Sequence, residues 1–234
     1  MKNYLLNPLV MKVMRLCLST IAIGVFCSSA NADVGGYIYG SDLDYSENAN
    51  IRHMKFKILS ESSGEYTVCV RKNANDGEDL PDIIGCLEIP ASITYSGHDY
   101  LVTQIDKEGF DDLSGITNVV IPEGVVSTEY FPFCDCPNLI SIDIPASLVF
   151  SGDISYMQSF ANNCPKLTAI NINPANTTIS SYDGAVYSAD GKTLFFVPEG
   201  KQEIEFAPTI NSFVENTFYN GGLISVTIPE SIIS

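Results

Sequence analysis

Few residues of this sequence have the types and spacing that catalysis or metal binding requires. The two histidines, His53 and His98, stand far apart, and neither has a set of metal ligands or a serine nucleophile elbow beside it. The motif Cys134-x-Cys136 has no second cysteine pair and no nearby histidine, which makes it a poor zinc site. We therefore expect no metal, no cofactor and no enzymatic activity.

Three further stretches resemble ligand or modification sites only in part. The acidic residues 75–79 lack the spacing of an EF-hand loop, so a solvated turn is favoured over calcium binding. Residues 191–193 (GKT) resemble the end of a phosphate-binding loop, but Val186 occupies a position where that loop needs glycine. Residues 176–178 (NTT) form a glycosylation sequon only in a host that glycosylates there.

Three carboxylates, Glu88, Asp143 and Glu205, occupy the same position in related segments of the chain. Paired acids on a sheet can cleave polysaccharides by acid–base catalysis. In this sequence the acids lie on different segments, and no pocket-forming loops or cationic residues are indicated near them. A polysaccharide hydrolase is therefore the least favoured function.

The segments that carry these acids form a repeat. The frame apolar-x-x-apolar-x-Ile fits residues 116–121, 139–144, 167–172 and 223–228, and shorter matches occur at 87–89 and 204–206. Alternation in the last three positions places two side chains on one face of a short strand and one on the other. The proline that often follows cannot donate to a ladder, so each strand should end there.

The spacing of these segments predicts stacked repeats. Their closing residues are 32, 23, 28, 34 and 22 residues apart, which indicates a period near 23 with insertions. A phenylalanine precedes the closing isoleucine by 10 to 12 residues in four cases: Phe110, Phe133, Phe160 and Phe218. Because one repeat buries too little apolar surface to offset the loss of chain entropy, neighbouring repeats must share a core. We predict a β-rich α/β solenoid of short parallel strands with irregular or short helical return segments.

The parts outside the repeat suggest a domain order. Residues 33–83 alternate polar and apolar side chains around a Ser-Ser-Gly turn, which predicts an N-terminal β-hairpin cap for a solenoid over residues 84–234. Residues 181–198 predict a β-hairpin inserted between repeats. No cap is visible after residues 226–228, so either the sequence is a fragment or the chain self-associates through this strand.

Residues 1–32 indicate a cleavable secretory signal peptide, with a start at Met1 or Met11. Lys12 and Arg15 flank the start of an apolar run over residues 16–26, and residues 30–32 (ANA) offer a small-x-small cleavage site. The run has 11 residues, whereas a membrane-spanning helix needs about 20, so a permanent anchor is less favoured. The chain is expected to be secreted or displayed on the cell surface.

Cleavage would leave a strongly acidic chain with five cysteines. It removes three of the 12 basic residues and none of the 28 acidic ones, which leaves a net charge of −19. Coulomb repulsion then opposes nucleic acid and anionic lipid as partners. The remaining cysteines are Cys69, Cys86, Cys134, Cys136 and Cys164. An odd number leaves at least one unpaired within the chain; Cys69–Cys86 and Cys134–Cys164 are conceivable disulfides, and buried thiols are an equal alternative.

Several motifs together resemble the BspA-like leucine-rich repeats of bacterial surface proteins. They are the Ile-Pro-x-x-apolar turns at 89–93, 121–125, 144–148 and 228–232, the Phe-x-x-Cys-Pro-x-Leu motif at 133–139, the ITYSG and VTQI stretches at 93–97 and 102–105, and residues 187–194. The resemblance covers about residues 84–234 and implies a leucine-rich repeat fold, export, a frequent role in adhesion and no general enzymatic activity. Asn173 departs from the pattern, because proline usually follows the strand.

Stacking would align the outward residues of the strands in two rows on a concave face. The first row is Glu88, Val120, Asp143, Asn171, Glu205 and Thr227, and the second is Cys86, Asn118, Ser141, Ala169, Glu203 and Ser225. The candidate partner-binding residues are Glu88, Asn118, Val120, Ser141, Asp143, Asn171, Glu205 and Thr227. We expect this shallow acidic surface to bind an extracellular protein or glycan. The alternative is a structural spacer module of a larger surface protein, without a ligand of its own.

Overall fold

The computed structural model describes residues 34–44, 48–62, 64–73, 83–150, 157, 159–218 and 221–233. All of them belong to one compact unit that spans residues 31–234. The predicted signal peptide and the acidic stretch at 75–79 lie outside the described residues. In the described part of the chain, no helix has the length and apolar character needed to cross a membrane.

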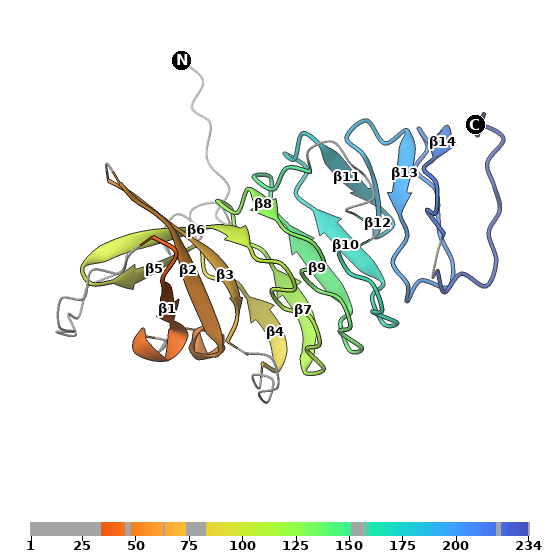
Figure 1. Cartoon of the computed structure of the whole chain (residues 1–234). Helices are drawn as coiled ribbons and strands as arrows, with labels where there is room; N and C mark the ends of the chain where they lie inside the picture. The colour runs from red at the N-terminus through yellow and green to blue at the C-terminus, as the bar shows by residue number, and fades with distance from the viewer. Residues whose placement is uncertain are drawn as a thin grey trace, which may run out of the picture. The chain divides into compact units, whose positions relative to one another are not determined.

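A parallel four-stranded sheet forms the repeated part of the fold. Its strands lie in the order β10 (Ala169–Ile172), β9 (Ser141–Ile144), β7 (Ile116–Val120) and β4 (Gly85–Glu88), and all neighbours are parallel. Figure 1 shows these four strands side by side in sequence order. Four of the six predicted strands are therefore present in one sheet.

The alternation of side chains along each strand explains why these segments pair. In β9, Ile142 and Ile144 are buried while Asp143 between them is exposed, and in β10 Ile170 and Ile172 flank the exposed Asn171 in the same way. A strand with one apolar face is stable only when that face packs against other apolar groups. The sheet therefore has one face in the core and one face in solvent.

The strand predictions at 204–206 and 223–228 are wrong. A second sheet follows β10, made of β11 (Ile179–Tyr182), β12 (Ala185–Ser188), β13 (Thr193–Phe196) and β14 (Ser212–Phe213), in that order. The turn between β11 and β12 takes the place beside β10, because the Ile170 amide donates to the Gly184 carbonyl (2.9 Å). The Glu205 amide donates to the Asp183 side chain (2.8 Å) rather than to a strand.

The N-terminal part forms a third sheet that includes the start of the repeats. It contains β1 (Tyr37–Tyr39), β2 (Met54–Ser62), β3 (Glu65–Lys72), β6 (His98–Ile105) and β5 (Ser92–Tyr95) in that order, with β8 (Ser127–Thr128) paired to β6. Strands β2 and β3 are antiparallel, and β3 is parallel to β6. Two short 3-10 helices, η1 (Gly40–Asp42) and η2 (Ala49–His53), precede β2.

The outer edge of β4 is covered by side-chain amides from the η2 region. Asn50 Nδ2 donates to the Cys86 carbonyl and Asn48 Nδ2 donates to the Glu88 carbonyl, both at 2.9 Å. Unpaired strand edges otherwise attract another strand, so these two contacts satisfy the carbonyls on the exposed side of β4.

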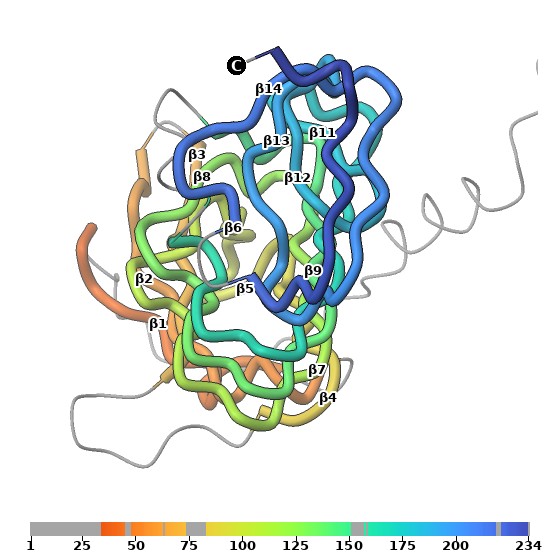
Figure 2. Tube along the Cα trace, turned by 90° about the vertical axis from the view of Figure 1, so that its right-hand side faces the viewer, coloured from red at the N-terminus to blue at the C-terminus, as the bar shows by residue number. Residues whose placement is uncertain are grey.

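Hydrogen bonds also join the segments that return the chain from one strand to the next. The Phe110 amide donates to the Pro132 carbonyl (2.9 Å), and the Phe133 amide donates to the Phe160 carbonyl (3.2 Å). Figure 2 shows the traces of successive repeats following one another as loops of similar outline. Consecutive repeats are thus hydrogen-bonded on the strand side and on the return side.

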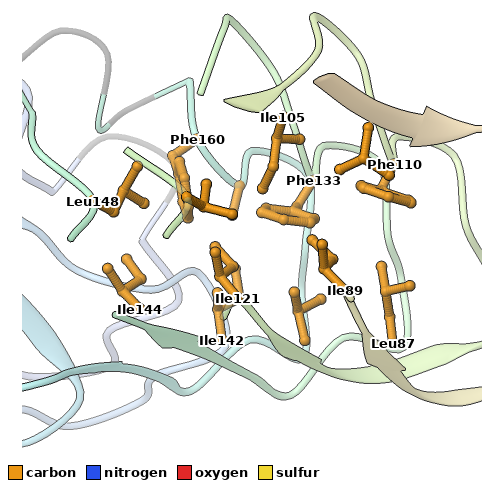
Figure 3. Packing of buried hydrophobic residues seen from close by; sticks show 14 of the residues in the cluster. Leu87, Ile89, Ile105, Phe110, Ile121, Phe133, Ile142, Ile144, Leu148 and Phe160 are labelled. Atoms are coloured by element: carbon orange, nitrogen blue, oxygen red, sulfur yellow. The ribbon is translucent and has the colours of Figure 1, made fainter. Parts of the chain in front are cut away.

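Phenylalanines from three return segments meet in the core. The Phe110 and Phe133 rings are stacked with centroids 6.0 Å apart, and the Phe133 and Phe160 rings meet edge to face at 5.4 Å. All three are buried, and Figure 3 shows them opposite the strand residues of the same cluster. Phe218, the fourth predicted member, contacts a separate cluster around Tyr187 and Leu194.

Polar side chains form hydrogen bonds between the turns that follow successive strands. The Glu123 carboxylate accepts from the Ala146 and Ser147 amides of the next repeat (2.8 and 3.1 Å). The Ser147 hydroxyl in turn donates to the Val125 carbonyl of the previous repeat (2.8 Å). Asn176 extends this pattern to the following turn, where its side chain is 8% exposed.

Candidate functional site

The parallel register brings the first four members of each predicted row together. Glu88 lies opposite Val120, Val120 opposite Asp143, and Asp143 opposite Asn171. The second row pairs in the same strands, from Cys86 through Asn118 and Ser141 to Ala169. We call the surface formed by these eight residues the strand face.

The first row is the more exposed of the two. Glu88, Asp143 and Asn171 are exposed, and Val120 is exposed at 36%, whereas Asn118, Ser141 and Ala169 are half-buried. Neighbouring residues of a parallel sheet on the same face are roughly 4.8 Å apart, so the rows present closely spaced side chains. The strand face is therefore a narrow, mainly polar surface, in whose first row Val120 is the one apolar residue and lies between two acids.

Hydrogen bonds between strands orient the polar groups of both rows. Asn171 Nδ2 donates to Asp143 Oδ1 (2.7 Å), and Asn118 Nδ2 donates to the Ser141 hydroxyl (2.7 Å). The Asn118 side-chain oxygen accepts from the Thr117 hydroxyl (2.9 Å). Asp143 and Glu88 are both exposed, so their carboxylate oxygens can accept hydrogen bonds from a ligand.

The last two members of the first predicted row do not lie in the sheet. Glu205 is exposed and sits beyond the β11–β12 turn, where its Oε1 accepts from the Tyr182 hydroxyl (3.1 Å). Thr227 is exposed in a segment that is not a strand. The members of the second row at these repeats, Glu203 and Ser225, are also exposed and outside any strand.

The β11–β12 turn adds residues to this surface that the sequence did not single out. Asp183 accepts from the Glu205 amide, and its Oδ2 forms an ion pair with Lys201 Nζ (3.1 Å). The hairpin predicted over 181–198 has its turn at residues 188–191, between β12 and β13. The sequence therefore did not indicate the β11–β12 turn, whose position beside β10 depends on contacts between the sheets. The Glu205 carboxylate therefore adds a negative charge at the β11–β12 turn, although Glu205 does not lie in a strand.

Negative charge dominates the electrostatics of these residues. Burial, followed by the charges of Glu88 and Asp143, raises the pKa of the exposed Cys86 thiol. The hydrogen bond to Glu205 likewise raises the pKa of the Tyr182 hydroxyl. Lys201 is the cation paired in this region, and its side chain is only 11% exposed. A cationic group would therefore approach Glu88, Asp143 and Glu205 with favourable Coulomb energy.

All five cysteines of the described chain are free thiols, so neither conceivable disulfide is formed. Cys69, Cys134, Cys136 and Cys164 are buried, as the alternative of apolar thiol packing predicts, and Cys86 is exposed. Burial raises the pKa values of Cys69 and Cys134 to about 12. Thiolates of these two groups are therefore scarce at neutral pH.

The stretch that resembled the end of a phosphate-binding loop forms hydrogen bonds within its own turn. At residues 191–193, the Gly191 amide donates to the Ser188 carbonyl and the Lys192 amide donates to Asp190 Oδ1 (2.8 and 3.1 Å). Hydrogen bonds from Ser188 and the Lys192 amide lower the pKa of Asp190. No group of metal-ligating side chains is found among the residues that the structure describes.

The asparagine of the sequon serves a structural role. Asn176 Nδ2 donates to the Pro145 carbonyl (3.1 Å) and the Leu148 carbonyl (2.8 Å). Its Oδ1 accepts from the Thr178 amide (3.0 Å), the Thr178 hydroxyl (2.9 Å) and the Ile179 amide (3.1 Å). A buried amide with both hydrogens engaged is out of reach of a glycosyltransferase in the folded chain.

Comparisons with solved structures find several bacterial proteins of low sequence identity. A leucine-rich repeat protein from Bacteroides ovatus ATCC 8483 is 20% identical, with a TM-score of 0.45 over 76% of this chain and 40% of that one. The pneumococcal vaccine antigen PcpA is 14% identical, with a TM-score of 0.36 over 82% of this chain and 64% of the antigen. This chain thus spans less than two thirds of either protein. No curated protein sequence matches it.

The family model described as the BspA type leucine rich repeat region matches six copies, over residues 91–183 and 191–234. The matched residues include β7, β9 and β10 and the return segments that carry Phe110, Phe133 and Phe160. They make up more than half of the chain. By its repeats and its leucine-rich repeat fold, the chain belongs to the BspA-type leucine-rich repeat family.

Proposed function

We propose that the chain is a secreted or cell-surface binding protein whose strand face engages a cationic or polyhydroxylated extracellular partner, such as a protein or a glycan. The observation that carries this proposal is the register of the two rows, which places Glu88, Val120, Asp143 and Asn171 on four consecutive strands. A repeated surface of this kind can engage an extended ligand through many weak contacts.

The chemistry of the rows favours such a partner. Asp143 and Glu88 supply negative charge, while Asn118, Ser141 and Asn171 supply amide and hydroxyl groups that can donate or accept hydrogen bonds. Hydroxyl groups of a sugar or ammonium and guanidinium groups of a peptide are complementary to this set. The formal net charge of −16 for the whole chain adds a long-range attraction for cations.

A solenoid architecture accounts for the strand face, and we include it in the proposal. Two observations support it: successive repeats are hydrogen-bonded through parallel strands, and they are also hydrogen-bonded through their return segments. The N-terminal sheet would then act as a cap for the first repeat, since Asn48 and Asn50 satisfy the outer carbonyls of β4.

We base the proposal of export to the cell surface on the sequence of residues 1–32 and on the similarity of the chain to the BspA-type repeats of bacterial surface proteins. Self-association through the C-terminal repeat stays a prediction, supported by the exposed side chains of Ile224, Val226 and Ile228.

Charge reversal on the strand face tests the binding proposal. We expect the purified chain to bind members of an array of extracellular-matrix proteins and glycans, and we expect Glu88→Lys with Asp143→Lys to weaken that binding at least tenfold. Two reversed charges change the electrostatic attraction and remove two hydrogen-bond acceptors. Affinity is measured by biolayer interferometry against each array hit, at low and at physiological salt.

A matched control separates the strand face from net charge. Glu65→Lys with Glu108→Lys makes the same change in charge at exposed positions outside the strand face. This variant should keep its affinity within about twofold, because long-range steering by exposed charges is screened at physiological salt. Equal losses in both variants, or no loss in either, would remove the strand face as the binding surface, and an array without any hit would favour the spacer function.

A further inference from the structure

Two buried cysteines occupy equivalent places in consecutive repeats. Cys136 Sγ lies against the Phe110 carbonyl (3.4 Å), and Cys164 Sγ lies against the Phe133 carbonyl (3.2 Å). Each sulfur therefore lies within hydrogen-bond distance of the carbonyl of the core phenylalanine one repeat earlier. Both side chains are fully buried.

The backbone contacts around these cysteines fix their register. The Phe133 amide donates to the Phe160 carbonyl (3.2 Å), and the Asp135 amide donates to the Asn162 carbonyl (2.9 Å). Asn163 Nδ2 also donates to Asp135 Oδ1 (2.8 Å), so the residues that directly precede the two cysteines are paired.

This register suits a disulfide. Backbone segments joined by such hydrogen bonds run about 4.8 Å apart, and a disulfide joins residues whose Cα atoms are about 4.4 to 6.8 Å apart. The two thiols also hydrogen-bond to each other. Closure of a bond between them therefore needs rotation of side chains rather than movement of the repeats.

The other three cysteines are directed elsewhere. Cys134 Sγ donates to the Ser159 carbonyl (3.2 Å) and accepts from the Asn162 amide (3.3 Å). Cys69 lies in β3, and Cys86 lies on the strand face. Of the thiols in the described chain, Cys136 and Cys164 are thus the two that occupy equivalent positions in consecutive repeats.

We propose that Cys136 and Cys164 are a covalent modification site, a dithiol that a small-molecule disulfide oxidises to a bond between consecutive repeats. The Cys136 thiolate attacks the oxidant RSSR, which forms a mixed disulfide and releases one thiolate, RS⁻. The Cys164 thiolate then attacks the Cys136 sulfur and releases the second. Two cysteine thiols lose two electrons, and the two thiolates released take up their two protons as RSH.

Because the Cys136 and Cys164 side chains are buried in the folded chain, we expect the oxidant to reach them before or during folding. The hydrogen bond with Cys136, together with burial, raises the pKa of Cys164, so its thiolate is scarce in the folded chain. An extracellular chain meets disulfide oxidants while it folds, and there the bond would link residues 28 apart in the sequence.

Peptide mapping after refolding tests the pairing. The full chain is unfolded, refolded in oxidised and reduced glutathione, alkylated and digested with a protease that cleaves before aspartate. Cleavage before Asp135, Asp143 and Asp153 places Cys134, Cys136 and Cys164 in different peptides. We expect the peptides of Cys136 and Cys164 to be joined by a bond that reductant breaks. Free thiols at both positions, or a bond that involves Cys134, would overturn the proposal.

Two serine variants keep the test specific. Cys134→Ser should leave the linked pair of peptides in place, whereas Cys136→Ser should abolish it. Reduction should lower the thermal midpoint of the wild-type chain and of Cys134→Ser by roughly 5 to 15 °C, and that of Cys136→Ser hardly at all. An equal effect of reductant on all three proteins would also contradict the proposal.

Discussion

Replacement of Phe133 by alanine should lower the free energy of unfolding by about 3 to 5 kcal/mol. The Phe133 ring is buried between the Phe110 ring at 6.0 Å and the Phe160 ring at 5.4 Å. Its removal leaves a cavity and ends two ring contacts that join three consecutive repeats. Denaturant unfolding followed by circular dichroism measures the loss, and it suits a chain without tryptophan.

A neighbouring phenylalanine provides the control for this experiment. Phe131 is 39% exposed and has a left-handed backbone (φ 58°), so its ring contributes less buried apolar surface than the fully buried ring of Phe133. Phe131→Ala should change the free energy of unfolding by no more than about 0.5 kcal/mol. Similar losses at both positions would show that the phenylalanine stack does not hold the repeats together.

Replacement of Asn176 should have a comparable effect for a different reason. We expect Asn176→Ala to cost about 3 to 5 kcal/mol, because it leaves two carbonyls and two amides without the side-chain partner that they have in the folded chain. Asn176→Asp keeps the shape and the acceptor but loses both donors, and at neutral pH it also buries a charge. Thermal and denaturant unfolding of both variants measure the loss.

Asn171 offers a matched asparagine on the strand face. Its side chain is exposed and makes one hydrogen bond, to Asp143. Asn171→Ala should therefore cost no more than about 1 kcal/mol. If Asn176→Asp were as stable as the wild-type chain, the two hydrogen bonds to the Pro145 and Leu148 carbonyls would contribute nothing to the free energy of unfolding, which would contradict this prediction.

The sequence predicted the parts of the fold that depend on local pattern. Alternation at residues 142–144 and 170–172 places an exposed residue between two buried ones, and the structure confirms this in β9 and β10. The recurrence of Phe110, Phe133 and Phe160 indicated a shared core, and their rings are in contact. These features follow from spacing alone, because each repeat packs the same residue types in the same places.

The parts that were mispredicted depend on contacts between distant segments. Residues 204–206 have the strand pattern, yet the place beside β10 is taken by the β11–β12 turn, which sequence spacing cannot reveal. Glu205 consequently joins Tyr182 rather than a row of strands. The buried role of Asn176 was also hidden, because a sequon and a turn asparagine look alike in sequence.

The register of the strand face is the central claim, and Cys86 allows a direct measurement of it. Asn118 lies opposite Cys86 on the neighbouring strand, whereas Asn171 lies on the far strand of the sheet. Asn118→Cys and Asn171→Cys are each treated with a short bifunctional thiol reagent that fluoresces only when it bridges two thiols. We predict a bridge from Cys86 to position 118 and none to position 171. A bridge to position 171, or none to position 118, would contradict the parallel register on which the proposed binding surface depends.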